Sequence, residues 1–352
     1  MAVVINGTTG IDKVQDGSIG TADIAADAIT TPKIADTVNL GRRNLVINGA
    51  MQVAQRGTSH TYSNNQSGYH SLDRIYSACF SSGGTLALSQ QHAGHDGVDA
   101  PKFLRATTAG TEGAGATVYS QHSIEGIEQF SNKQVTISFM VKANASTTFQ
   151  LRREYYYGSG GTSTEYSGFV DVPVTTSWTK FTHTFSAVDF SSKTIGSSNY
   201  YSLMFYWSTN QGSNKVRDGN IDITNIQLEF GDTATPFEHR SYGEELSACQ
   251  RYCQLLTAAA GFASSTSAVE FGIGFYPEMR GAPSAAATAA LIVERHNITA
   301  YTQSSAAVTI VHSTSRGAKF TISNFSGLTA GNGYTYSGYQ SGSGHIVLTA
   351  EL

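Results

Sequence analysis

Aromatic side chains that could bind a ligand occur in three clusters, each beside amide, hydroxyl or charged residues. Flat rings pack against the C–H face of a sugar, and neutral polar groups hydrogen-bond its hydroxyls. The candidate ligand-binding residues are Tyr155, Tyr157, Trp207, Asn332, Tyr334, Tyr336, Tyr339 and Gln340. The same rings also suit packing within a sheet or contact between chains. The pattern therefore indicates carbohydrate binding, with packing as the open alternative.

The local sequence predicts how two of these clusters are presented. Successive side chains of a strand point to opposite faces, so Tyr156 should oppose Tyr155 and Tyr157, and one of the two sides should be core. Residues 331–344 hold three tyrosines among five glycines without apolar periodicity. This composition predicts an exposed, adaptable loop.

Residues suited to catalysis or metal binding are scarce. The sequence has no G-x-S-x-G, H-E-x-x-H or phosphate-loop motif. His92, His95 and Asp96 have ligand chemistry, but their glycine-rich surroundings favour a solvated loop, and Asp222 alone is weak evidence for calcium. We expect no enzymatic activity, no cofactor and no metal site. A glycosidase carboxylate pair stays open, because the separation of the two groups depends on the fold.

Composition favours a β-rich protein with a neutral, hydroxyl-bearing surface. Among 352 residues only 14% are charged, against about 25% in typical soluble proteins, while aromatics reach 11% and glycines number 36. The net charge of -4 gives no global basic field, so we expect no nucleic-acid partner. The sequence holds no apolar run of membrane-spanning length and no signal peptide, so we expect no membrane insertion.

Period-two alternation dominates residues 41–238. Val135, Ile137 and Phe139 alternate with polar or exposed types, which is typical of a strand with one buried face. The apolar parity changes within 221–230, which predicts a β-bulge near Thr224–Asn225. Many such strands between Gly/Ser/Thr/Asn turns favour a jelly-roll β-sandwich.

A helical pattern follows the predicted sandwich. Ser241 and Glu244 fit a capping box at a helix start. The apolar residues beyond it recur at spacings of three, four and three, as in a seam between helices. The seam residues are Leu246, Cys249, Cys253 and Leu256. We expect an amphipathic linker helix over 239–257 that packs either on copies of itself or on the sandwich.

Cysteine spacing argues against disulfides. Three cysteines do not form a framework, and two on one helical face cannot easily bridge. Cys249 and Cys253 are therefore expected to be buried free thiols.

The C-terminal part returns to short strands. Val269–Tyr276 and Ala307–Ser313 are two of four segments that read as strands between Gly and Ser turns. Residues 258–352 are thus expected to form a small β domain, which is a candidate receptor-binding tip.

The N-terminal segment 1–40 is a short repeat. Ile19, Ile24, Ile29 and Ile34 are five residues apart. A unit this short cannot bury its aliphatic side chains alone, so these residues are expected to meet sister chains around a shared axis. A flexible tail with accidental spacing is the alternative.

Several sequence islands resemble bacteriophage tail fibre proteins that carry a sandwich related to carbohydrate-binding modules. The decads of 16–35 resemble D-G-(S/A)-I-T-x-x-K-(I/L)-A fibre units. The remaining islands lie in the order of that family at 44–53, 72–74, 139–143, 176–181, 226–238, 244–252 and 276–283. They resemble the signatures NL-x-x-NG, QLE-x-G with ATPFE, EEL-x-x-CQRY and P-x-MR-x-AP.

This resemblance implies a homotrimeric fibre in the virion, made in the host cytoplasm. Its N-terminus would attach to phage tail or baseplate proteins, and its distal part would adhere to bacterial surface polysaccharide or lipopolysaccharide. One alternative is a structural adaptor that carries another receptor-binding protein. A capsule-degrading tailspike is a further alternative, although the sequence shows no long run of β-helix rungs.

Overall fold

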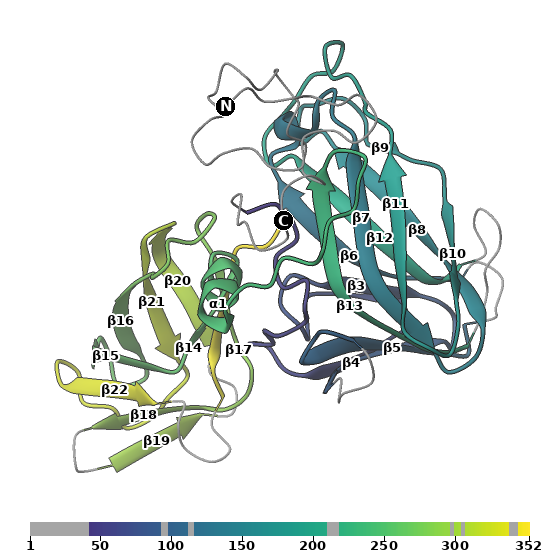
Figure 1. Ribbon diagram of the computed structural model, residues 1–352. Helices are drawn as coiled ribbons and strands as arrows, with labels where there is room; N and C mark the ends of the chain where they lie inside the picture. The colour runs from purple at the N-terminus through teal and green to yellow at the C-terminus, as the bar shows by residue number, and fades with distance from the viewer. Residues whose placement is uncertain are drawn as a thin grey trace, which may run out of the picture. The chain divides into compact units, whose positions relative to one another are not determined.

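The fold is taken from a computed structural model (Figure 1). It describes residues 42–92, 98–111, 116–209, 218–295, 299–303, 307–337 and 344–352. By its contacts the chain divides into two compact units, 1–42 and 43–352. The predicted repeat with Ile19, Ile24, Ile29 and Ile34 lies outside the described residues, so association of copies through it stays a prediction.

Residues 59–230 form two packed antiparallel sheets. The six-stranded sheet runs in the order β1 (Ser59–Ser63), β4 (Thr85–His92), β5 (Lys102–Ala109), β13 (Gly219–Phe230), β7 (Val135–Ala143) and β11 (Thr179–Phe185). The seven-stranded sheet runs in the order β10 (Val170–Val174), β8 (Thr147–Tyr156), β12 (Tyr200–Thr209), β6 (Thr117–Glu125), β3 (Tyr76–Phe80) and β2 (Gln66–Gly68), with β9 (Glu165–Tyr166) beside β8. A short 3-10 helix, η3 (Ile127–Phe130), follows β6. The fold class is the expected mainly-β jelly-roll sandwich.

The sandwich core fills the space between the two sheets. Alternate residues of each strand point inward, as the period-two pattern predicts. Phe205 and Trp207 of β12 stack with ring centroids 5.8 Å apart, and Phe149 of β8 lies 5.3 Å from Trp207. These rings are almost fully buried.

The predicted bulge in β13 is confirmed. The register between β13 and β7 shifts between Thr224 and Gln227, and Asn225 has a left-handed φ of 52°. Asparagine tolerates this conformation better than most residues. The bulge restores the inward parity of Ile226 and Leu228.

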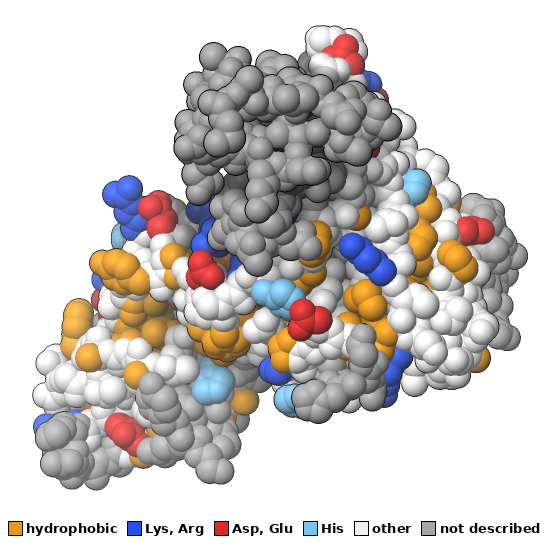
Figure 2. All heavy atoms as spheres, in the orientation of Figure 1, with side chains coloured by type: hydrophobic (Ala, Val, Ile, Leu, Met, Phe, Trp, Pro, Cys, Tyr) orange, Lys and Arg blue, Asp and Glu red, His pale blue; other side chains and the backbone are white. Residues whose placement is uncertain are grey.

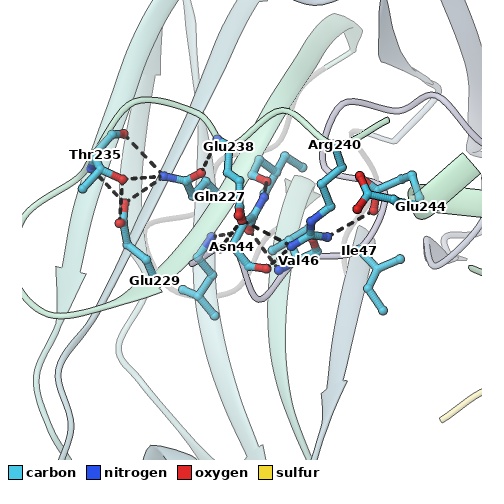
Figure 3. A network of polar contacts seen from close by, with 12 residues as sticks. Asn44, Val46, Ile47, Gln227, Glu229, Thr235, Glu238, Arg240 and Glu244 are labelled. Carbon is cyan, nitrogen blue, oxygen red and sulfur yellow. Dashed lines mark hydrogen bonds and ion pairs between the residues drawn. The ribbon is translucent and has the colours of Figure 1, made fainter. Parts of the chain in front are cut away.

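A buried polar network fastens the segment after β13 onto the sandwich (Figure 3). The Glu229 carboxylate accepts hydrogen bonds from the backbone N–H and the hydroxyl of Thr235, both at 2.8 Å. The Gln227 amide oxygen accepts from the Glu238 N–H at 2.8 Å. The Asn44 N–H donates to Glu238 at 2.8 Å, and the Asn44 amide oxygen accepts from Leu228 at 3.1 Å. Residues 232–238 are thereby held against the outer side of the six-stranded sheet.

The linker helix is shorter than expected. In α1 (Tyr242–Gln250), Ser241 and Glu244 form the predicted capping box. The helix ends before Cys253, however, and Cys253–Leu256 form strand β14 paired with β23 (Ile346–Thr349). The expected boundaries 239–257 are therefore wrong. Among the described residues no helix is long and apolar enough to cross a membrane.

The prediction of a seam between helices is wrong for the same reason. Cys253 and Leu256 have strand geometry, so they cannot continue a helical stripe with Leu246 and Cys249. Cys249 and Cys253 are fully buried inside the chain, which leaves neither free to meet a sister chain. The spacing was that of a helix, but backbone pairing with β23 determines the conformation. Cys79, Cys249 and Cys253 are all buried free thiols, as expected.

The C-terminal residues form the expected small β domain. One sheet has the order β19 (Thr299–Gln303), β18 (Leu291–Arg295), β22 (Gly333–Ser337), β15 (Ala258–Ala263), β16 (Val269–Gly274), β21 (Gly317–Ser323) and β20 (Ala307–Thr314). A second has the order β14, β23 and β17 (Ser284–Ala287). Phe271 and Phe320 stack at 5.4 Å in the core of this domain.

A buried charged cluster ties this domain to the sandwich. The guanidinium of Arg74 lies 3.6 Å from the ring centroid of Tyr252 and pairs with the Glu351 carboxylate. Arg56 donates to the same carboxylate at 3.0 Å, and the Gln55 side chain donates to the Cys253 carbonyl at 2.9 Å. Charge-assisted hydrogen bonds of this kind are stronger than neutral ones.

Candidate functional site

Three of the predicted ligand-binding residues belong to the sandwich core. Tyr155 is 1% exposed, Tyr157 0% and Trp207 1%. The Trp207 indole donates to the Ser120 hydroxyl at 2.8 Å, so even its polar edge is satisfied internally. The predicted alternation of the Tyr155–Tyr157 triplet is correct, but the side predicted to bind is the core side. The prediction of ligand binding by these three residues is therefore wrong.

The C-terminal tyrosines are also core residues. Tyr334 and Tyr336 lie in β22, between β18 and β15, and are 2% and 0% exposed. The Tyr336 hydroxyl donates to the Gly344 carbonyl at 2.9 Å. The expected exposed loop is thus wrong for Gly333–Ser337, which form a strand with tyrosines inward, while 338–343 lie outside the described residues. Asn332 is half-buried just before β22, while Tyr339 and Gln340 lie outside the described residues.

The acidic candidates have protein partners. Asp222 accepts two hydrogen bonds from the Arg105 guanidinium, at 2.7 and 2.8 Å. His95 and Asp96 lie outside the described residues. Within the part of the chain that the structure describes, no three His, Cys, Asp or Glu residues group as a metal site.

The outer side of the seven-stranded sheet carries an aromatic surface that the sequence analysis missed. We call it the tyrosine face. Its rings are those of Tyr69, Tyr76, Phe80, Tyr119, Tyr156, Tyr166, Phe169, Tyr200 and Tyr206. Most are half-buried, Tyr166 and Phe80 are 47% and 39% exposed, and Tyr206 is buried at 5%. The rings on strands lie opposite to the sandwich core, because their strand neighbours point inward; Tyr69 and Phe169 lie in connecting segments.

Part of the tyrosine face is a continuous row that crosses the strands. The ring centroids of Tyr76 and Tyr119 are 6.4 Å apart, and those of Tyr119 and Tyr206 are 5.3 Å apart. Phe169 continues the row at 5.1 Å from Tyr206. Cross-strand pairing of β3, β6 and β12 sets this order, since Tyr119 is the register partner of Tyr206. Tyr76, Tyr119 and Tyr206 are therefore held by paired strands, while Phe169 lies in the segment between β9 and β10.

Polar side chains lie next to the row on the same face. The Gln121 amide donates to the hydroxyls of Ser202 at 2.8 Å and Ser123 at 3.0 Å. Ser202 is the register partner of both Ser123 and Glu154 on the neighbouring strands. Ser123, Ser202 and Glu154 are buried, whereas Gln121 is half-buried, so the amide of Gln121 is the group of this set that a sugar hydroxyl can reach.

One acid and one base complete the site. Burial raises the pKa of the Glu154 carboxyl, and its hydrogen bonds to Tyr166 and Ser202 oppose that shift. The Arg152 guanidinium lies 4.0 Å from the ring centroid of Tyr166 and 4.8 Å from that of Phe169. Burial also raises the pKa of the Tyr119 phenol, so this group stays a hydrogen-bond donor at neutral pH.

No family model matches the chain, and no curated protein sequence matches it. Solved structures match about half of it at low identity. A putative sugar-binding protein from Bacteroides thetaiotaomicron is 12% identical, with a TM-score of 0.34; the match covers 54% of this chain and 100% of that one. A family 11 carbohydrate-binding module from Clostridium thermocellum, solved with a mixed-linked tetrasaccharide, is 12% identical over 51% and 99%, with a TM-score of 0.33.

The enzymatically active domain of tailspike protein 4 of bacteriophage CBA120 is also similar. It is 12% identical with a TM-score of 0.32, and the match covers 53% of this chain but only 21% of that one. Likenesses of this size are loose, so the function proposed below rests on the residues of the site.

Proposed function

We propose that the protein binds glycans on its tyrosine face, as the sandwich module of a bacteriophage tail fibre that adheres to bacterial surface polysaccharide. The row Tyr76–Tyr119–Tyr206–Phe169 carries this proposal. Most other aromatic rings of the described sandwich pack in its core, and Phe103 and Trp178 form a separate pair at 5.5 Å. The rings of the row lie on the other side of the sheet, where Tyr166 keeps 47% of its surface exposed.

The chemistry of the face suits neutral sugar units in a chain. Several rings in a row offer C–H stacking to successive units. Gln121 and Arg152 lie on the same face and supply hydrogen-bond donors and acceptors for hydroxyl groups. Because the strands hold these groups, little conformational entropy is lost on binding.

The place of the module in a phage particle is supported by the sequence islands at 44–53, 226–238, 244–252 and 276–283. In this proposal the segment 1–40 attaches the fibre to the tail or baseplate, and the fibre is a homotrimer in the virion. In this proposal the glycan is bound without being cleaved.

A glycan array probed with the full chain tests the proposal. Tyr119→Ala and Tyr206→Ala should each weaken binding at least about tenfold, which corresponds to about 1.4 kcal/mol. Tyr242→Ala is the matched control, because Tyr242 is 55% exposed on α1, outside the tyrosine face. Bound glycan should also release no new reducing ends. Wild-type binding that survives both tyrosine variants unchanged would refute the proposal.

A further inference from the structure

A hollow opens on the opposite side of the sandwich, away from the tyrosine face. It has a volume of about 440 Å³ and lies between the outer side of the six-stranded sheet and residues 236–239. Its lining includes Asp99, Met140, Lys180, Asn225, Phe237 and His239. In Figure 2, where the side carrying β7, β11 and β13 faces the viewer, hydrophobic, basic, acidic and histidine side chains gather on this surface. The volume lies in the range of small-molecule sites, about 300–1,000 Å³.

The β13 bulge builds one wall of the hollow. At Asn225 the chain has its left-handed φ of 52°, and the amide nitrogen of Asn225 donates to the Asp99 carbonyl at 2.8 Å. The amide oxygen of Asn225 has no hydrogen-bond partner among the described residues, although the residue is only 6% exposed. A buried acceptor without a donor is costly, so a ligand hydroxyl at this point would recover a hydrogen bond. Bulges commonly re-aim a side chain beside a site.

The other polar groups of the hollow balance in charge. Lys180 donates to the Thr235 carbonyl at 3.2 Å, and an ammonium group has further hydrogens for a ligand. His239 lies 3.0 Å from the Asp99 carboxylate. Because the formal charges of Lys180 and Asp99 cancel, the hollow favours a neutral ligand.

Apolar surface completes the lining. Phe237 and Met140 contribute a ring and a thioether, and Phe237 meets His239 edge-on with centroids 4.9 Å apart. A ring-shaped ligand with hydroxyls at its edge would contact the apolar side chains with its ring and the polar groups of Asn225 and Lys180 with its hydroxyls.

We infer that the hollow is a second sugar site, which takes a single neutral hexose unit independently of the tyrosine face. The ligand ring packs against Phe237 and Met140, one hydroxyl donates to the Asn225 amide oxygen, and another accepts from Lys180. The two sites lie on opposite sheets, so one chain can hold two separate parts of a surface glycan.

The test is saturation-transfer NMR of the full chain with free glucose, galactose and mannose, and with glucuronic acid as a charged probe. At least one neutral hexose should bind, and the acid should bind more weakly. Asn225→Gly removes the unmet acceptor while keeping a residue that accepts positive φ. It should weaken hexose binding at least about tenfold, and Lys180→Met should do so several-fold.

Lys133→Met serves as the control, because Lys133 lies over the Phe230 ring outside the hollow. Melting temperature reports whether Asn225→Gly perturbs the fold, and Lys180→Met gives an answer that does not depend on the bulge. Hexose signals that are absent in the wild type, or unchanged in both variants, would overturn the inference. Tyr119→Ala should leave hexose binding intact, so the two proposed sites can fail separately.

Discussion

The two outer sides of the sandwich are built from the same kind of strand but differ in what lies on them. On the six-stranded sheet, Gln227 and Glu229 bind the backbone of the following segment through Thr235 and Glu238. On the seven-stranded sheet, rings such as Tyr119 and Tyr166 extend outward from the strands. The first side uses buried polar groups to hold its own chain. The second carries half-exposed rings, on which we propose that glycans bind.

The largest expected effect contrasts the two sides of one strand. Tyr155 points into the core and neighbouring Tyr156 belongs to the tyrosine face. Tyr155→Ala should lower the free energy of unfolding by about 3–5 kcal/mol, because it leaves a large cavity. Tyr156→Ala should lower it by less than about 1 kcal/mol. Urea unfolding of both variants measures the difference, and equal losses would mean that the tyrosine face contributes to the core.

A second variant removes hydrogen bonds that hold residues 232–238 on the six-stranded sheet. Glu229→Ala removes the acceptor for the Thr235 N–H, the Thr235 hydroxyl and the Gln227 amide. The Thr235 N–H is then left unpaired, while the Gln227 amide and the Thr235 hydroxyl keep other acceptors, so the loss should be about 1–3 kcal/mol of unfolding free energy. Glu229→Gln keeps one acceptor oxygen and should cost less. Calorimetry of both variants checks this order, and glycan binding on the tyrosine face should persist in the folded fraction.

Low pH should lower the unfolding free energy through His122, which lies on the core side of the sheet that carries the tyrosine face. Burial lowers the pKa of His122 well below 6.5, and its ring accepts the Ile47 N–H at 3.4 Å. The unfolded chain therefore binds a proton that the folded chain rejects, so stability falls as pH drops below 6.5. The slope should approach about 1.4 kcal/mol per pH unit until the lowered pKa is reached. Unfolding at pH 7 and pH 5 measures it, and His122→Asn should reduce the difference.

The smallest expected effect has the opposite sign. Burial raises the pKa of Glu154 above 4.5, so the folded state holds its proton to higher pH than the unfolded state. The contribution of Glu154 to stability therefore falls as pH rises through that window. Glu154→Gln should remove this dependence and change the unfolding free energy at pH 7 by less than about 1 kcal/mol. Melting temperatures between pH 4 and pH 7 show whether the profile flattens.

Local pattern predicted the strands, the bulge at Thr224–Asn225 and the Ser241 cap, because each depends on neighbours in sequence. It did not predict the end of α1, since pairing of Cys253 with Thr349 decides that boundary. Period two also showed that Tyr155 and Tyr157 share a side. Which side faces the core depends on the second sheet, whose strands are distant in sequence.

The sequence analysis did not predict the tyrosine face for a related reason. Tyr76, Tyr119 and Tyr206 are single residues on three strands, and only pairing of β3, β6 and β12 brings them together. A cue was present in Tyr206–Trp207, where one aromatic had to point away from the core. Without the register, nothing in the sequence tells which one does.

The contacts of Asn44 have a consequence for synthesis on the ribosome. Asn44 binds Glu238, which lies 194 residues later, so the sandwich cannot close until that segment has emerged. At 5–20 residues per second, translation of this interval takes roughly 10 to 40 s. During that time one edge of the early strand β5 lacks β13 as a neighbour. Nascent chains on one messenger RNA are thus exposed to strand pairing between copies before each can complete its own sheet.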